Sequence, residues 1–219
     1  MKFSEESISA LRERISADPE ISPKRKAHIL AVERMAARLG SLYMPEKTDI
    51  LRVAALLHDV TKEYPSVRQI EICRRYGHEP TREELCAPKT FHARTAAYLI
   101  PDLYPGYADP EVISAVRWHT TGHAGMTLSE MLIYLADYID DTRTFDDCVK
   151  LRRAFFDACP EKMSAEERTE HLLNIIIMSY RMTVSGLISN GLPISPDTVF
   201  SMNELLCRKI EKGEKENGK

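Results

Sequence analysis

Prolines and the spacing of apolar residues divide this chain into a series of helical segments. Of its twelve prolines, eleven lie where a helical pattern would begin or stop, and Pro110 suits the first position of the segment that follows it. Between the prolines, apolar residues recur at three- and four-residue steps, as Val32, Met35 and Leu39 do. The sequence therefore predicts helices over about 5–17, 23–39, 47–59, 65–76, 89–100, 110–119, 127–140, 144–158, 163–188 and 196–211.

The fold class follows from this pattern. Alternating β-branched runs bounded by turn dipeptides, which would predict strands, are almost absent. The chain has 219 residues, of which 43% are hydrophobic, and this suits one globular domain with a real core. We therefore expect an all-α fold, a single helical bundle over 1–211, with a functional core at about 22–141 and C-terminal helices over 144–211. The tail 212–219 is expected to be disordered.

Charge and cysteine content limit the partners of the protein. A formal net charge of -3 is too small to favour capture by nucleic acid or by a membrane surface. The apolar stretch LLNIIIM is far shorter than the ~18 residues of a spanning helix, and MKFSEESISALRER does not resemble a secretory leader. Five widely spaced cysteines argue against a disulfide framework and fit a reducing cytoplasm. No motif sets the oligomeric state, and a homodimer is compatible with the sequence.

Six polar side chains lie on the apolar faces of the predicted helices. A single histidine in such a place is usually a hydrogen-bonded core residue, and a buried carboxylate is costly without a cation beside it. Six such groups on five helices are better explained by one shared metal site. Imidazole and carboxylate together suit first-row divalent metals, and a set this rich can hold two ions with one carboxylate bridging. The six residues are His28, His58, Asp59, His92, His119 and Asp137.

The order of these residues resembles the HD-domain phosphohydrolase superfamily, whose minimal signature is H…HD…D. The chain is also similar to the YqeK family, the bacterial symmetrical bis(5'-nucleosyl)-tetraphosphatases, over about 22–206. This similarity is carried by the segments RKAHILAVERMAARLG, AALLHDVTKE, AVRWHTTGHAGMTLSEMLIYLADYIDDTR and PISPDTVFSMNELL. Two positions depart from the family pattern: Ser195 replaces a histidine, and Asp140-Asp141-Thr142 stands where the family tends to have Glu-Pro. Neither departure affects the six residues.

The resemblance implies an HD-domain bundle that cleaves diadenosine tetraphosphate symmetrically into two ADP molecules. It implies that one divalent ion is held by His28, His58, Asp59 and Asp137, and a second by His92 and His119, with Asp59 bridging the two and catalytic in that role. Iron is the expected metal, with manganese or another first-row metal as the alternative. A water activated by the ions would attack phosphorus in line with the leaving phosphate.

Three cations are placed to contact a polyphosphate. Arg25 lies three residues before His28, Lys62 follows the His58-Asp59 doublet, and Arg143 follows the helix of Asp137. A lysine at a helix C-terminus is also explained by the helix dipole, but cations at a helix N-terminus are not, which suggests an anion near Arg25. We predict that the three line a polyphosphate channel and that Lys62 and Arg143 act in catalysis.

The loop after His119 is a further candidate for substrate binding, because flexible loops rich in hydroxyl groups often shape the entrance to a site. For its histidine, an exposed loop residue without a role is the simpler explanation. The loop residues are Thr120, Thr121, Gly122 and His123.

Three other functions stay open. The chain could hydrolyse another nucleotide, such as a nucleoside mono- or triphosphate or a cyclic dinucleotide. It could also sense a nucleotide without cleaving it, although degenerate HD modules usually lose metal ligands. A di-iron enzyme that consumes oxygen is the third alternative.

Overall fold

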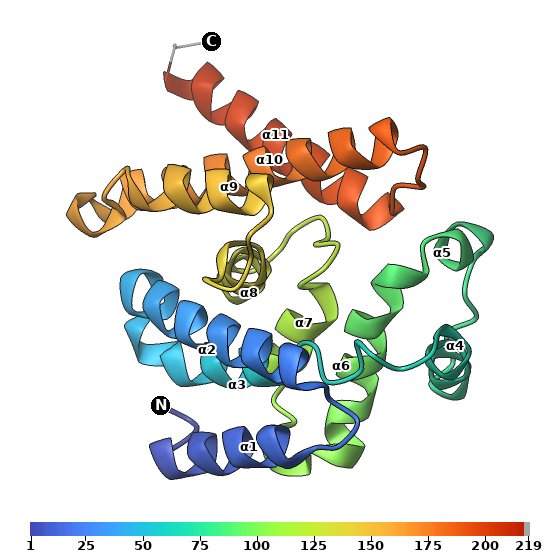
Figure 1. Ribbon diagram of the computed structural model, residues 1–219. Helices are drawn as coiled ribbons and strands as arrows, with labels where there is room; N and C mark the ends of the chain where they lie inside the picture. The colour runs from blue at the N-terminus through green and yellow to red at the C-terminus, as the bar shows by residue number, and fades with distance from the viewer. Residues whose placement is uncertain (217–219) are drawn as a thin grey trace.

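The chain consists of helices and their connecting loops. The computed structural model describes residues 1–216, and no strand occurs among them. The all-α prediction is therefore confirmed. The α-helices (Figure 1) are α1 (Glu5–Ala17), α2 (Pro23–Tyr43), α3 (Thr48–Leu57), α4 (Ser66–Arg75), α5 (Arg82–Cys86), α6 (Phe91–Leu103), α7 (Pro110–Trp118), α8 (Leu128–Ile139), α9 (Asp146–Phe156), α10 (Ala165–Ser189) and α11 (Pro196–Glu216).

Capping residues and prolines set where these helices begin. Ser22 caps α2 by accepting a hydrogen bond from the Arg25 backbone N–H at 3.2 Å, and Pro23 follows at the first helical position. Proline suits this position because its φ is already helical and its missing N–H would have no partner there. The same reason explains four 3₁₀ turns that each begin with a proline: Pro45–Lys47, Pro88–Thr90, Pro105–Tyr107 and Pro160–Lys162.

Four elements differ from the sequence prediction. Helix α2 runs to Tyr43, four residues beyond the predicted end at residue 39. Pro101 lies inside α6 instead of ending it, and because only two residues of the helix follow it, few backbone hydrogen bonds are at stake. The five-residue α5 was not predicted, since it buries no side chain and is set by a capping box between Thr81 and Glu84. Helix α11 runs to Glu216. Residues 212–216 of the expected disordered tail are therefore helical, and 217–219 lie outside the described residues.

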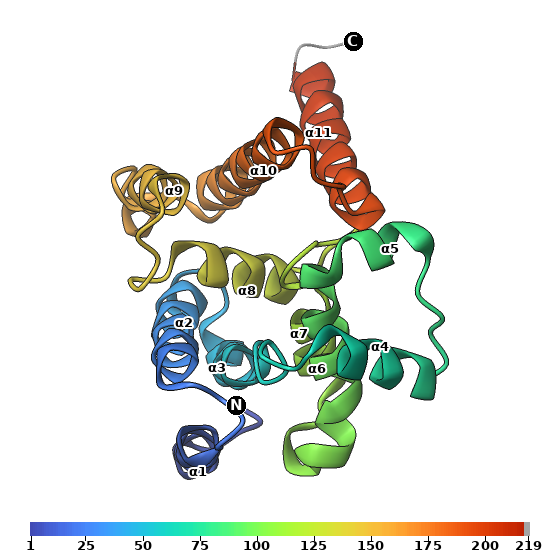
Figure 2. The same ribbon diagram turned by 45° about the vertical axis from the view of Figure 1, so that its right-hand side comes forward.

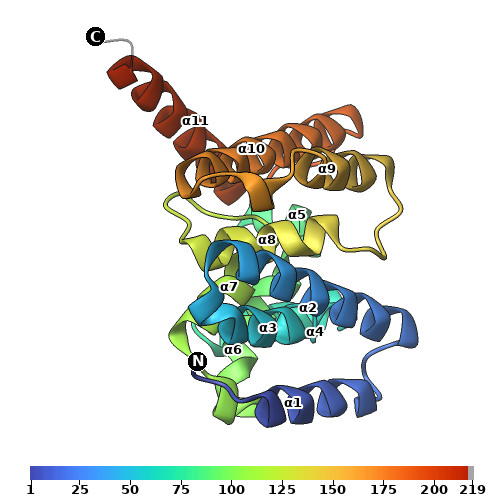
Figure 3. The same cartoon turned by 90° about the vertical axis from the view of Figure 1, so that its left-hand side faces the viewer.

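Five helices enclose the core that carries the predicted site. Helix α2 packs against α3 and α8, and α7 packs against α3, α6 and α8. Figure 2 shows α8 lying across α2, α3 and α7, with α9, α10 and α11 forming a further layer above it. Figure 3 places α1 at the opposite end of the molecule, below α2 and α3. The site thus lies between the N-terminal helices and α8, on which the C-terminal helices pack.

Helix α10 bears on the prediction that the chain has no membrane span. By length and composition alone it could cross a membrane, although core helices of soluble proteins meet the same description. It buries residues such as Ile176 and Tyr180 and packs against α8, α9 and α11. Protein contacts therefore account for the more apolar face of this helix.

Candidate metal centre

The six side chains predicted to bind metal come together in one place. Each comes from the end or the inner face of a different helix, apart from the neighbouring His58 and Asp59, which directly follow α3. Five of the six are buried, and Asp137 is partly exposed. The inward direction that helical periodicity predicted for these side chains thus agrees with their burial. His28 lies on α2, His92 on α6, His119 directly after α7 and Asp137 on α8.

Asp59 lies between two pairs of histidines. Its Oδ2 atom is 3.6 Å from Nε2 of His28 and 3.5 Å from Nε2 of His58. Its Oδ1 atom is 3.2 Å from Nε2 of His92 and 3.7 Å from Nε2 of His119. Burial raises the pKa of Asp59, but His58, His119 and His92 outweigh that effect and hold the pKa well below its usual value. The carboxylate is thus charged, with one oxygen directed toward each pair.

Backbone carbonyls orient three of the four imidazoles. The Nδ1 atoms of His58, His92 and His119 lie 2.6, 2.8 and 2.7 Å from the carbonyl oxygens of Ala55, Lys89 and Val116. Because a carbonyl accepts hydrogen bonds, Nδ1 carries the proton and the lone pair lies on Nε2. Each of these Nε2 atoms therefore has a lone pair that can bind a metal, because a hydrogen bond at Nδ1 fixes the tautomer of a metal-binding histidine.

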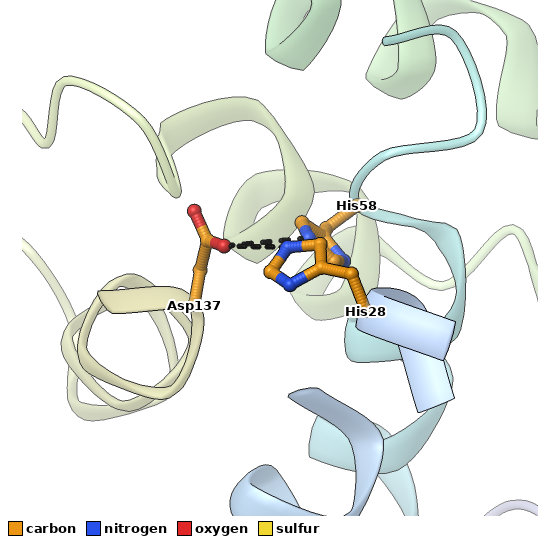
Figure 4. Close-up of side chains that lie close together, drawn as sticks. All are labelled: His28, His58 and Asp137. Carbon is orange, nitrogen blue, oxygen red and sulfur yellow. Dashed lines mark ion pairs between the residues drawn. The ribbon is translucent and has the colours of Figure 1, made fainter. Parts of the chain in front are cut away.

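Among the described residues, some buried polar atoms at the centre have no hydrogen-bond partner. They include Nε2 of His58 and Oδ1 of Asp59. Oδ1 of Asp137 is 2.9 Å from Nε2 of His28 and 3.8 Å from Nε2 of His58, and Figure 4 shows all three side chains directed toward one point. Unsatisfied buried polar groups are rare in proteins. Donor atoms of His28, His58 and Asp137, and of His58, Asp59 and His119, lie close enough to share an ion, so the residues fit a metal centre.

Burial and neighbouring charges set the protonation of the histidines. Burial lowers the pKa of His58 to about 3 and that of His92 to about 4, so both imidazoles are neutral at pH 7. Burial also lowers the pKa of His28, but Asp137 and Asp140 outweigh this effect and raise it to about 9. A metal ion held by His28 would therefore have to displace the proton that the two carboxylates favour there.

Asp140 is a buried residue at the site that the sequence did not identify. Its side chain is 0% exposed, and its Oδ2 atom is 3.3 Å from Nδ1 of His28, on the opposite side of the ring from Asp59 and Asp137. Its Oδ1 atom accepts a hydrogen bond from the backbone N–H of Thr142 at 2.8 Å. Asp140 thus orients His28 as the backbone carbonyls orient the other three histidines. Only its place in a segment that departs from the family pattern could have drawn attention to it.

We expect the Asp140→Asn variant to bind divalent metal more weakly. Carboxylates behind a metal-binding histidine typically contribute about 10–100-fold to metal affinity. Titration of the metal-free protein with Mn²⁺ against a fluorescent chelator would measure the change. The matched control is Asp141→Asn, which removes the same charge from the adjacent, exposed position. Equal affinities for the two variants would show that Asp140 does not orient His28.

The three predicted phosphate-binding cations all reach the centre. Nη1 of Arg25 is 2.5 Å from Oδ2 of Asp59, and Nη2 of Arg143 is 2.5 Å from Oδ1 of Asp137. Nζ of Lys62 is 3.1 Å from Nε2 of His92, and burial lowers the pKa of this lysine. Positive charge therefore borders the centre at both carboxylates and at His92.

The loop between α7 and α8 divides into two parts. Thr120 faces the centre, with its Oγ1 atom 3.0 Å from Nε2 of both His92 and His119. Thr121 and Gly122 are buried, and the Thr121 carbonyl accepts a hydrogen bond from the Thr198 hydroxyl of α11 at 3.2 Å.

His123 turns away from the centre. Its Nε2 atom is 3.1 Å from Oε2 of Glu130, and its ring lies 4.5 Å from that of Trp118. Of the four loop residues, Thr120 thus lies at the centre. Thr121 and Gly122 pack against the C-terminal helices, and His123 contacts Glu130 and Trp118 instead of the centre.

Comparison with known proteins places the chain in a family of hydrolases. Residues 25–142 match the HD domain family. The chain is 30% identical to a symmetrical bis(5'-nucleosyl)-tetraphosphatase of Halalkalibacterium halodurans over 87% of this chain and 94% of that protein. It is 28% identical to the Bacillus subtilis protein of the same name over 85% and 92%. A crystal structure of a predicted HD superfamily hydrolase involved in NAD metabolism, from Clostridium acetobutylicum, is similar with a TM-score of 0.74 and 28% identity, over 94% of this chain and 98% of that one.

Proposed function

This chain is a metal-dependent phosphohydrolase of the HD domain family, and we propose that it cleaves diadenosine tetraphosphate symmetrically into two ADP molecules. The names of the Halalkalibacterium halodurans and Bacillus subtilis relatives, which match over most of their length, support this substrate. The reaction adds one water across the central phosphoanhydride. The water oxygen joins one of the two inner phosphorus atoms, and the bridging oxygen leaves with the other ADP and takes up a proton.

The observation that carries the proposal is the position of Asp59, with one carboxylate oxygen toward His28 and His58 and the other toward His92 and His119. This arrangement supports a pair of ions bridged by Asp59, for which we propose iron, with manganese as the alternative. When bound, two such ions lower the pKa of a shared water and neutralise phosphoryl oxygens. Asp137 would complete the ligands on the side of His28 and His58.

Arg25, Lys62 and Arg143 would bind the phosphoryl oxygens. Arginine presents a planar pair of donors that suits phosphate, and lysine provides a compact charge. All three have donor atoms within 3.1 Å of a side chain of the centre. Their charges would stabilise the negative charge that grows on the leaving ADP, as fixed donors do in other phosphoryl-transfer sites.

Alanine at Arg25, Lys62 or Arg143 is therefore expected to lower kcat/KM for diadenosine tetraphosphate by about 10²-fold, because removing one donor to a developing charge typically has this effect. Initial rates with the metal-loaded protein would measure it. Lys24→Ala is the matched control, since it removes an exposed cation next to Arg25. Three variants with the wild-type kcat/KM would exclude a polyphosphate channel at these residues.

The experiment that tests the function is chromatography of the products after incubation with diadenosine tetraphosphate and ferrous iron or manganese. ADP as the sole product would support symmetrical cleavage. ATP with AMP would place the cleaved bond elsewhere. An intact substrate in the presence of bound metal would favour another nucleotide, and a protein that binds no metal would favour a nucleotide-sensing role. Oxygen consumption would identify a di-iron oxygenase.

The remaining properties are also proposals. We propose a cytoplasmic protein that acts on a nucleotide and does not require nucleic acid or a membrane as a partner. The five cysteines, all unpaired, agree with a reducing compartment. A homodimer is the proposed assembly, which light scattering at micromolar concentration would test.

A further inference from the structure

Two cavities meet at the wall formed by Lys62, Thr120 and Thr183. We propose that each cavity binds one nucleoside of a dinucleoside polyphosphate, so that the polyphosphate between them crosses the metal centre. This inference rests on the proposed function and identifies where the two ends of the substrate lie. It also assigns a role in substrate binding to C-terminal segments that lie outside the matched HD domain.

The first cavity, here called the α8–α9 cavity, has a volume of about 480 Å³. The metal centre contributes His119 and Asp137 to its wall, and Arg143 provides a cation. Two aromatic residues, Tyr138 and Phe145, also line it. The side chain of Phe145 is 69% exposed, so its ring is available to stack on a base.

The second cavity, here called the α5–α10 cavity, has a volume of about 430 Å³. Its walls come from the turn after α5, which provides Pro88 and Lys89, and from the end of α10 and the following loop, which provide Leu187 and Leu192. Figure 2 shows α5 close to the start of α11, where this loop ends. The lining combines aliphatic side chains with the hydroxyl groups of residues such as Thr90 and Ser195, and Lys89 adds a cation.

The shared wall connects both cavities to the centre. Thr120 Oγ1 is 3.0 Å from Nε2 of His92 and of His119, and Nζ of Lys62 is 3.1 Å from Nε2 of His92. A ligand that enters both cavities must therefore pass beside these histidines. Its middle would lie next to the metal centre, where the central phosphoanhydride has to be for symmetrical cleavage.

The size and charge of each cavity suit one half of the substrate, a nucleoside diphosphate. Pockets of about 300–1,000 Å³ accommodate one small organic ligand, and both cavities lie in the lower half of this range. Each cavity also has a cation of its own, Arg143 in one and Lys89 in the other, and both share Lys62. The α8–α9 cavity also contains the carboxylates of Asp137 and Asp147. Two cavities on either side of the centre suit a polyphosphate with a nucleoside at each end better than a mononucleotide.

The test compares two truncations at the outer walls, Phe145→Ala and Leu192→Ala. Their side chains are 69% and 51% exposed, so neither truncation leaves a hole in the core. Phe200→Ala is the matched control, because Phe200 is 61% exposed and lines neither cavity. Initial rates are measured for the metal-loaded full chain with diadenosine tetraphosphate and with adenosine 5'-tetraphosphate, which has one nucleoside.

We expect each truncation to raise KM for diadenosine tetraphosphate by about tenfold, since one stacked base or one buried aliphatic contact contributes about that much. Phe200→Ala should keep the wild-type KM. Adenosine 5'-tetraphosphate needs only one cavity, so one of the two truncations should affect its KM far less than the other. If the truncations acted only through the fold, each would raise KM for both substrates by a similar factor.

Two failures can be told apart. If wild-type protein left diadenosine tetraphosphate intact, the proposed function would fall and this inference with it, before any variant was compared. If the wild type cleaved it into two ADP but either truncation kept the wild-type KM, that cavity would hold no nucleoside. The inference would then be overturned while the proposed function stood.

Discussion

Replacing Asp59 with alanine is expected to lower kcat/KM for diadenosine tetraphosphate by at least about 10³-fold, because metal ions contribute several kcal/mol to stabilising the transition state. The Asp59 carboxylate lies within 3.7 Å of Nε2 of all four histidines of the centre. Its loss would remove the carboxylate that links the two halves of the site. Metal content by elemental analysis should fall together with activity.

Two further variants make this result specific. Asp59→Asn keeps the shape of the side chain but removes its charge, and it should lose metal as the alanine variant does. Asp157→Ala removes an exposed aspartate at the end of α9 and should behave as wild type. An Asp59→Ala protein with full metal content and wild-type turnover would contradict the assignment of the centre.

The Gly122→Ala substitution is expected to lower the free energy of unfolding by about 3 kcal/mol, which combines the strain of a left-handed alanine with overpacking. Gly122 has a φ of 63°. A Cβ atom at this position would overlap the Tyr180 hydroxyl and approach Oγ of Ser201 to 2.9 Å. Thermal unfolding followed by circular dichroism should show a Tm lower by about 10 °C for a chain of this length.

The chain offers a matched control for this effect. Gly125 also has a positive φ, 82°, but a Cβ atom added there would have no neighbouring atom within 4 Å. Gly125→Ala should therefore show only the backbone strain, about 1 kcal/mol. Adding Tyr180→Phe to Gly122→Ala removes the overlapping hydroxyl and should restore part of the lost Tm. Equal Tm changes for the two glycine variants would show that the contact with Tyr180 is not tight.

The loop that contains Gly122 connects this stability effect to the site. Thr120 lies two residues before Gly122 and contacts His92 and His119. The Tyr180 hydroxyl of α10 also lies 2.7 Å from Oγ of Ser201 on α11, which joins the two helices beneath the loop. Displacing the loop would therefore move a wall shared by both cavities as well as destabilise the fold.

The sequence predicted most helices and the faces that they bury. Helical periodicity depends on local geometry, so His28 on the stripe of Val32, Met35 and Leu39 could be placed inward from the sequence alone. The same local information failed for α5, which has no buried face, and for Pro101, which lies near enough to a helix end to be tolerated. Predictions from periodicity thus succeeded where a helix has an apolar stripe.

The sequence by itself predicted the chemistry of the centre, because four histidines and two aspartates on apolar faces are better explained by one shared metal site than by six separately satisfied buried groups. Only the tertiary structure decided which atoms face one another. It placed Asp59 between two histidine pairs, Asp140 behind His28, and His123 away from the centre. It also brought Phe145 and Leu192 to the cavities. These relations depend on packing between helices far apart in the chain, and local periodicity carries no information about which helices become neighbours.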